Sequence, residues 1–389
     1  MNDMKKQSLL RKTVLFLLFF CLSAASFSLT SFGEATIGET VPEEYHELLD
    51  VLPDGITSLL PSGLFSSEAE AVGEAVNEMG SFSYLLQTVL SLVGIRLGDC
   101  LRLLASVAGM LLLSAVCRTV QVSFAQQHVA RAFSFCTTLI ILSFLLTRGY
   151  DSIQSCASYF SNLGKMSAAS IPLLGGLYAM GGNVSAAVAS SAGLTVFMSL
   201  LEGVIGNTVV PFCGICLAFA AVGALDPSIR VGTLAATIKR HYTTALTFLM
   251  MLLLTMVSAQ TLLGAKSDTL AMKSAKFAAG NLIPVVGGSI SELLRTVSAG
   301  VGYLRGTVGI CAVLLLLLLL LPTLIELLLV RLCWQLCASL ADLLGCDGEK
   351  RLLEEFASLH GYLIAAVCIC SSVLFLTFTL LAHCASAIG

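Results

Sequence analysis

Long apolar runs separated by short polar stretches fill the chain from residue 103 onward. A helix that crosses a bilayer needs about 20 mostly apolar residues, and the leucine-rich run Gly306–Val330 is long enough to meet this requirement. The pattern contains nine apolar segments, some of them short or rich in glycine and serine: Leu103–Val120, Ala132–Thr147, Met166–Gly182, Ala186–Gly206, Thr208–Leu225, Tyr242–Gly264, Ile283–Tyr303, Gly306–Val330 and Gly361–His383. We therefore predict an all-α, polytopic helical membrane protein with about 7–9 transmembrane segments.

The first 100 residues have a different pattern. A basic start, the apolar run Val14–Leu22 and small residues at the expected cleavage position are typical of a signal peptide over residues 1–25, or of an uncleaved anchor. Ser26–Ile95 contains eleven acidic residues and no lysine or arginine. We therefore expect residues 26–100 to form an acidic extracytoplasmic leader with short helices, one of them over Glu68–Met79.

Two stretches are expected to lie on the membrane surface rather than across it. Phe82–Ile95 is apolar at helical spacing, but it is short and charged residues follow it directly. Residues 331–360 are amphipathic and include the single tryptophan, Trp334. Because tryptophan is enriched at membrane interfaces, we predict interfacial helices here with Trp334 at headgroup level. Residues 361–389 are then expected to supply a C-terminal transmembrane helix.

A six-residue motif occurs twice in the apolar part of the chain. Ile171–Gly176 reads Ile-Pro-Leu-Leu-Gly-Gly, and Ile283–Gly288 reads Ile-Pro-Val-Val-Gly-Gly. Around each copy the order is an apolar span, a basic loop, a second span, the motif and a long span. This shared order favours two membrane repeat units of four helices each, residues 103–206 and 208–330, over chance recurrence in a chain rich in glycine and leucine.

Two short basic loops, Arg118–Arg131 and Asp226–Arg240, indicate how these units are oriented. Short loops rich in lysine and arginine stay in the cytoplasm. Both loops can be cytoplasmic only if an even number of crossings separates them, so the repeats are predicted to be parallel rather than inverted. The segment Ala265–Leu282 conflicts with this topology, because it is basic and yet falls on the outer side.

Proline and paired glycines disturb the regular hydrogen bonding of a helix, and membranes tolerate this only where protein or water satisfies the freed groups. We therefore predict that the two motif segments face each other or a central cavity, with glycines allowing close approach of the backbones. The alternative is that each proline only kinks a peripheral helix. The residues predicted to form this broken-helix site are Pro172, Gly175, Gly176, Lys276, Asn281, Pro284, Gly287 and Gly288.

Two acidic residues, Glu202 and Glu326, lie within apolar spans. A charged side chain at the centre of a membrane costs about 2.5–3.5 kcal/mol on insertion scales, so such residues usually face the interior of a bundle. We therefore predict that both are intramembrane acidic sites. The alternatives are that Glu326 is an interfacial partner of Arg331, and that Glu202 lies too near its helix end to line a polar path.

Composition supports a membrane protein and excludes some functional classes. Hydrophobic residues make up 57% of the 389 residues, and the charged share of 12% is about half that of soluble proteins. The net charge is −3 without a basic cluster, which argues against nucleic acid as a partner. Most of the 14 cysteines lie inside apolar runs, where a thiol behaves as a small hydrophobic group.

No motif predicts catalysis. Cys213 and Cys216 form a C-x-x-C pair, but no histidine or second pair accompanies them, so a metal or redox site is the weaker interpretation. His46–Asp50 begins as H-E-x-x and then lacks the second histidine. The sequence has neither a Walker loop nor a G-x-S-x-G elbow. We therefore expect a protein that is not an enzyme and that binds no cofactor, metal ion or nucleotide.

The stretch Lys273–Gly288, followed by Ser291, Thr296–Val297 and Val308–Gly309, resembles the stage III sporulation protein AE family. The signal peptide, the acidic leader and the helix-rich remainder are also similar to that family. The resemblance implies an endospore-forming bacterium and a multi-pass protein of the mother-cell membrane that surrounds the forespore. It also implies a channel or secretion-like complex between the two cells, with other sporulation membrane proteins and the lipid bilayer as partners. The family has no established catalytic residues, so the resemblance assigns no catalytic role to any position of this sequence.

The repeat and the proline motifs leave a second function open. A secondary transporter or permease would hold its substrate at the paired broken helices, since transporters bind near the midplane at repeat interfaces. Many co-purifying sporulation proteins would favour the complex, whereas an isolated protein stabilised by a solute would favour the transporter.

Overall fold

The computed structural model describes residues 41–122, 127–180, 184–200, 207–225, 233–249, 251–252, 255 and 287–386. Within these residues the chain is helical apart from short turns, and it forms no β-strand element. The predicted all-α fold is therefore confirmed. The predicted signal peptide, residues 1–25, lies outside the described residues.

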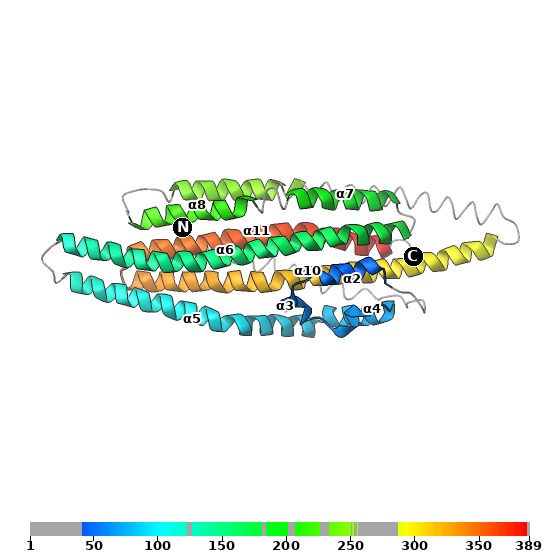
Figure 1. Cartoon of the computed structure of the whole chain (residues 1–389), viewed down its shortest axis with the longest axis horizontal. Helices are drawn as coiled ribbons and strands as arrows, with labels where there is room; N and C mark the ends of the chain where they lie inside the picture. The colour runs from blue at the N-terminus through cyan, green and yellow to red at the C-terminus, as the bar shows by residue number, and fades with distance from the viewer. Residues whose placement is uncertain are drawn as a thin grey trace.

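Four long helices run side by side along the long axis of the molecule (Figure 1). They are α5 (Phe82–Val122), α6 (Gln127–Met180), α10 (Gly287–Leu343) and α11 (Asp347–Ser386). Two shorter helices, α7 (Val184–Leu200) and α8 (Asn207–Leu225), pack against α6, and α8 also packs against α11. A further helix covers residues 233–249.

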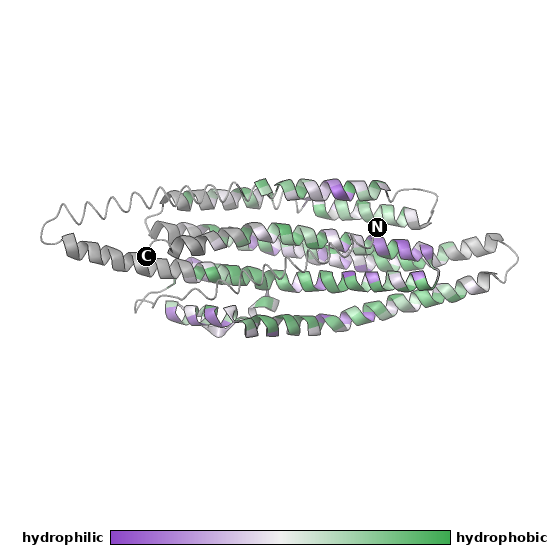
Figure 2. Cartoon of the chain, turned by 180° about the vertical axis from the view of Figure 1, so that it is seen from behind, coloured by the Kyte–Doolittle hydropathy of each residue, from purple (hydrophilic) through white to green (hydrophobic). Residues whose placement is uncertain are grey.

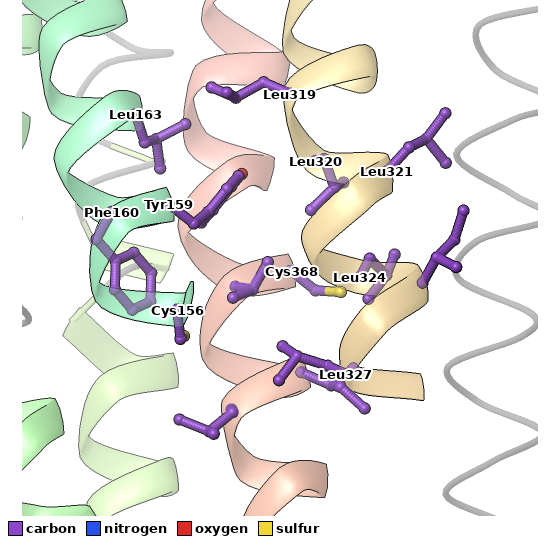
Figure 3. Packing of buried hydrophobic residues seen from close by; sticks show 14 of the residues in the cluster. Cys156, Tyr159, Phe160, Leu163, Leu319, Leu320, Leu321, Leu324, Leu327 and Cys368 are labelled. Carbon is purple, nitrogen blue, oxygen red and sulfur yellow. The ribbon is translucent and has the colours of Figure 1, made fainter. Parts of the chain in front are cut away.

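The helix α10 occupies the centre of this bundle and packs against α5, α6 and α11. Its most apolar 18-residue window is 83% buried inside the chain, whereas the corresponding window of α5 is only 28% buried. In Figure 3, Leu320 and Leu324 of α10 lie on one side of α11, next to Cys368, and the buried residues Tyr159 and Leu163 of α6 lie on its other side. The leucine-rich run of α10 therefore forms the core of the bundle. Most of the apolar window of α5 is instead exposed on the surface of the chain.

Three of the described helical stretches are long and apolar enough to cross a membrane: Phe82–Cys117, Thr307–Leu343 and Asp347–Ser372. This supports a membrane protein. The finer prediction of 7–9 spans, and of two parallel repeats, stays a prediction.

Several predicted segments belong to longer helices than expected. Ala132–Thr147 lies in the single helix α6 together with most of Met166–Gly182, so no loop divides them. Likewise Phe82–Ile95, which was predicted as a short helix on the membrane surface, is the first part of the longer helix α5. The physical reason is that isolated charged residues do not stop a helix when their side chains find partners.

The acidic leader is not free in water. Its helices are α2 (Glu43–Asp50), α3 (Asp54–Thr57), the 3₁₀ helix η1 (Ser62–Phe65) and α4 (Ala69–Gly80), so the expected short acidic helix is confirmed in α4. The leader packs on α10 and α6, and the Tyr45 hydroxyl donates to the Leu64 carbonyl and lies 3.5 Å from Cys311 Sγ. Burial, followed by the Cys311 sulfur, raises the pKa of Tyr45 far above its ordinary value.

Residues 331–360, which were predicted to form amphipathic interfacial helices, are not separate helices, and their place at a membrane interface stays a prediction. They form the second half of α10 and the start of α11, which meet in a tight turn. Gly345 adopts φ +68° there, and Cys346 N–H donates to the Ala341 carbonyl, as in a Schellman cap. Trp334 is fully buried between the two helices rather than on an outer surface, with its ring tilted against Phe356.

Candidate functional site: a charged belt across the bundle

A layer of charged residues crosses the long helices at one level. We call it the belt, and it consists of Arg96, Asp99 and Arg102 on α5, Arg148 and Asp151 on α6, and Glu326 and Arg331 on α10. Sulfur contacts fix the register of α5 and α10, because Cys100 Sγ donates to the Leu329 carbonyl and Cys333 Sγ to the Cys100 carbonyl, each at 3.4 Å.

Glu326 joins three helices at this level. Its Oε2 lies 3.3 Å from Arg96 Nη2 of α5, and Ser155 Oγ of α6 donates to its Oε1 at 3.0 Å. The side chain of Glu326 is 18% exposed and that of Arg96 is 43% exposed. Pairing of Glu326 with Arg331 was the alternative from the sequence, but its ion-pair partner is Arg96 instead. The carboxylate ties α5, α6 and α10 together.

The outer members of the belt are well exposed. Asp99 and Arg102 approach to 3.4 Å, and Arg148 and Asp151 to 3.7 Å, with more than half of each side chain open. Exposed pairs of this kind contribute between nothing and about 1 kcal/mol. Their significance lies in position, since they mark where the surface of the bundle faces polar surroundings.

Beyond the belt, α5 and α6 carry two stretches without charge, Arg102–Arg118 and Arg131–Arg148. As α-helix, each stretch spans roughly 25 Å. The charged turn between α10 and α11 lies beside the stretch of α5, where Ser114 Oγ donates to Glu349 Oε1 at 2.9 Å. The exposed large side chains of the two stretches are apolar, as the colouring of Figure 2 also shows for the described residues. These side chains are Leu112, Leu113, Val116, Phe135, Leu139 and Ile140.

A second ion pair lies inside the bundle, closer to the turn between α10 and α11. Lys239, on the helix over residues 233–249, is 3% exposed and pairs with Glu355 of α11. Its Nζ also lies 6.0 Å from the centre of the Tyr362 ring. The sequence placed Lys239 in a basic loop, Asp226–Arg240, which is wrong from residue 233 onward because the chain is helical there. The sequence did not single out its partner Glu355, because Glu355 is one of several charged residues in the amphipathic stretch 331–360.

The predicted broken-helix site is only partly described. The helix α6 continues through Pro172 to Met180, so the unwound segment expected there is absent from the described chain. Among the described residues, no atom would lie within 4 Å of a Cβ atom on Gly175 or Gly176, so no described backbone approaches these glycines closely. Gly287 and Gly288 are the first residues of α10. The remaining residues of the prediction, Lys276, Asn281, Pro284 and Glu202, lie outside the described residues, so the pairing of the two motifs is untested.

A small pocket lies between α8, the helix over residues 233–249 and α11. Tyr242 stacks on Phe212 there with ring centres 4.0 Å apart, and its hydroxyl pairs with that of Thr208 at 2.9 Å. Cys213 on the pocket wall and nearby Cys216 are free, buried thiols. Within the described residues, no group of three histidine, cysteine, aspartate or glutamate side chains is arranged to hold a metal ion.

Apolar helices of membrane length, packed around a buried leucine-rich helix and crossed by a charged belt, define a helical membrane-type protein. The family model of stage III sporulation protein AE matches residues 70–385, and the chain belongs to this family. Stage III sporulation protein AE of Bacillus subtilis (strain 168) is 24% identical over 300 residues, which cover 77% of this chain and 73% of that protein. No solved structure matches the chain. The resemblance noted from the sequence is confirmed, and it implies a role in sporulation.

Proposed function

We propose that the protein is a multi-pass component of the apparatus that connects mother cell and forespore and supports forespore development. Membership of the stage III sporulation protein AE family over residues 70–385 carries this proposal, together with three apolar helices of membrane length. The protein acts in the mother-cell membrane around the forespore, by assembling with other sporulation membrane proteins. It contributes binding surfaces rather than catalytic chemistry.

The outer face of α6 supports an assembling role. Gln154, Ser158, Ser161 and Lys165 are exposed and follow one another at helical spacing on the side of the belt that is nearer the leader. A polar stripe on a helix favours water or protein as its neighbour rather than lipid tails. We therefore assign this stripe to contact with a partner protein or to the wall of an aqueous passage in the assembly.

Affinity purification of the full chain from sporulating cells, with identification of the co-purifying membrane proteins, tests the proposal. The wild-type protein is expected to recover a set of sporulation membrane proteins, and the double substitution Ser161→Leu with Lys165→Leu should recover less of that set. The matched control Leu113→Ile, on the apolar surface of α5, should recover the same set as the wild type. A protein that purifies alone and is stabilised by a small solute would instead favour the permease.

A further inference from the structure

Two free cysteines meet where α5 packs on α10. Cys100 Sγ of α5 donates to the Leu329 carbonyl of α10, and Cys333 Sγ of α10 donates to the Cys100 carbonyl, each at 3.4 Å. The two thiols also contact each other. Each sulfur therefore lies against the backbone of the opposite helix at the same turn, so the two side chains meet across the contact.

This arrangement suits a covalent bond between the two sulfurs. A cysteine side chain is short, so a sulfur that touches the carbonyl of the opposing cysteine brings the two backbones close together, as a disulfide requires. The hydrogen bonds that the thiols make at present are weak, because S–H is a poor donor. A disulfide would replace weak contacts here without a large movement of either helix.

The thiol pair lies next to the ion pair of Arg96 and Glu326 in the contact between α5 and α10. Arg96 is one turn before Cys100, and Glu326 is about one turn before Leu329, whose carbonyl Cys100 meets. A bond at the thiols would therefore fix the same register of α5 and α10 that the ion pair selects.

Polar surroundings reach the outer side of α5 at this level. Asp99 and Arg102 flank Cys100, and more than half of each side chain is exposed. Cys100 is 7% exposed and Cys333 is 3% exposed, so Cys100 is the less deeply covered thiol. Local opening of the contact between the two helices exposes these sulfurs to a small water-soluble reagent.

We propose that Cys100 and Cys333 form a reversible disulfide by exchange with a low-molecular-weight disulfide. Cys100, as thiolate, attacks one sulfur of the reagent, whose S–S bond breaks and releases one reagent thiol. Cys333, as thiolate, then attacks the Cys100 sulfur of this mixed disulfide, so the Cys100–Cys333 bond forms and the second reagent thiol leaves. The two cysteines lose two electrons and two protons, and the reagent takes up both as two thiols.

The bond locks α5 onto the central helix of the bundle. The two cysteines are 233 positions apart in the chain. Joining positions so far apart restricts the unfolded chain strongly and so favours the folded one. The redox state of this pair therefore sets how firmly α5 is held on α10, while the reduced protein keeps only the ion pair and side-chain packing.

Peptide mass spectrometry of the full-length protein in mild detergent tests the pair. The protein is incubated with mixtures of reduced and oxidised glutathione, quenched in acid and alkylated after unfolding. Peptides linked through Cys100 and Cys333 are expected to accumulate in oxidising mixtures and to separate again in reduced glutathione. Cys333→Ala should abolish this link, whereas the matched variant Cys337→Ala, one turn further along α10 and equally buried, should leave it intact.

Thermal unfolding measures the effect of the bond on the bundle. Oxidation should raise the Tm of the wild type and of Cys337→Ala by on the order of 5 °C, and it should leave the Tm of Cys333→Ala unchanged. A linked wild-type protein with an unchanged Tm would contradict the locking of α5 onto α10. Free thiols at both positions in the most oxidising mixture, or links from Cys100 to Cys337 or to several other cysteines, would overturn the proposed pair.

Discussion

The carboxylate of Glu326 on α10 lies 3.3 Å from the guanidinium of Arg96 on α5, two residues separated by most of the described chain. Ser155 of α6 donates to the same carboxylate. One acidic side chain in an otherwise leucine-rich helix thus holds three long helices in register. A polar contact of this kind specifies how apolar helices align, because their remaining surfaces could slide past one another at little cost.

Replacing Glu326 is expected to destabilise the bundle more than replacing an exposed belt residue. Glu326→Ala should lower the free energy of unfolding by about 1–3 kcal/mol, because it removes a charge-assisted contact and leaves Ser155 without its acceptor. Asp99→Ala should change it by less than about 1 kcal/mol, since its pair with Arg102 is exposed. Denaturation in mixed detergent micelles measures both. Strictly additive effects of Glu326→Ala and Arg96→Met would contradict a direct coupling between the two side chains.

Gly149 and Gly175, both on α6, should respond in opposite ways to alanine. A Cβ atom on Gly149 would lie 2.6 Å from Cε1 of the buried Phe356 ring, whereas one on Gly175 meets nothing within 4 Å. Overpacking should therefore cost Gly149→Ala about 1–3 kcal/mol. Gly175→Ala should be neutral or stabilising by up to about 1 kcal/mol, because alanine favours helix. The same micelle titration reports both, and addition of Phe356→Leu should restore much of the loss at Gly149.

Tyr45 should control how firmly the leader docks on α10. Tyr45→Phe removes the hydroxyl that donates to the Leu64 carbonyl, so the leader should be cleaved faster in limited proteolysis at neutral pH. The exposed Tyr150→Phe is the matched control. A cleavage rate equal to that of the control would contradict a role for this hydroxyl.

Docking of the leader should also weaken at alkaline pH. The pKa of Tyr45 is raised on folding, so the undocked form loses its proton first and the contribution of Tyr45 falls as pH rises above about 10, the ordinary tyrosine value. Proteolysis followed from pH 8 to 11 should show this loss in the wild type and a shallower one in Tyr45→Phe. An identical pH profile in both proteins would contradict the assignment.

The two ends of the bundle should be labelled from opposite sides of the membrane. The leader contacts Cys311 in the first half of α10, whereas Thr237 lies two residues from Lys239, which pairs with Glu355 of α11. In a background without accessible cysteines, Glu74→Cys should react with an impermeant reagent outside intact cells, and Thr237→Cys should be protected. Gln126→Cys, in the predicted cytoplasmic loop, should be protected as well. Labelling of Thr237→Cys from outside would overturn this topology and the parallel repeat.

Much of the architecture follows from the sequence pattern. Hydropathy predicts apolar helices because a membrane helix must satisfy its backbone internally, and the short helix predicted over Glu68–Met79 is close to the observed α4, Ala69–Gly80. The hydropathy pattern did not reveal which of the predicted spans belong to one continuous helix. The predicted span Ala132–Thr147 ends just before Arg148, yet Arg148 and Asp151 form an i,i+3 pair on the surface of the continuous helix α6.

Burial was harder to predict than helicity. Leu316 lies in the most apolar run of the sequence and is fully buried in the core, so Leu316→Phe is expected to overpack it. Trp334 was expected at headgroup level and Lys239 in a cytoplasmic loop, and both are buried. Hydropathy cannot separate these cases, because a helix that is apolar on all sides suits both a lipid environment and the centre of a bundle. Only the contacts of distant helices decide between the two.

The contact between Tyr45 and Cys311 sets an order for the biogenesis of the protein. The two residues are 266 positions apart, so the leader waits for most of the chain to be synthesised before its docking surface on α10 exists. Until then its apolar side chains are unprotected, and so are those of α5 and α6 that α10 later covers. Contacts of such long range form late and slowly, and the intermediates before them are prone to aggregation. A chain truncated before residue 307 should accordingly be a substrate for proteolytic quality control rather than a smaller working protein.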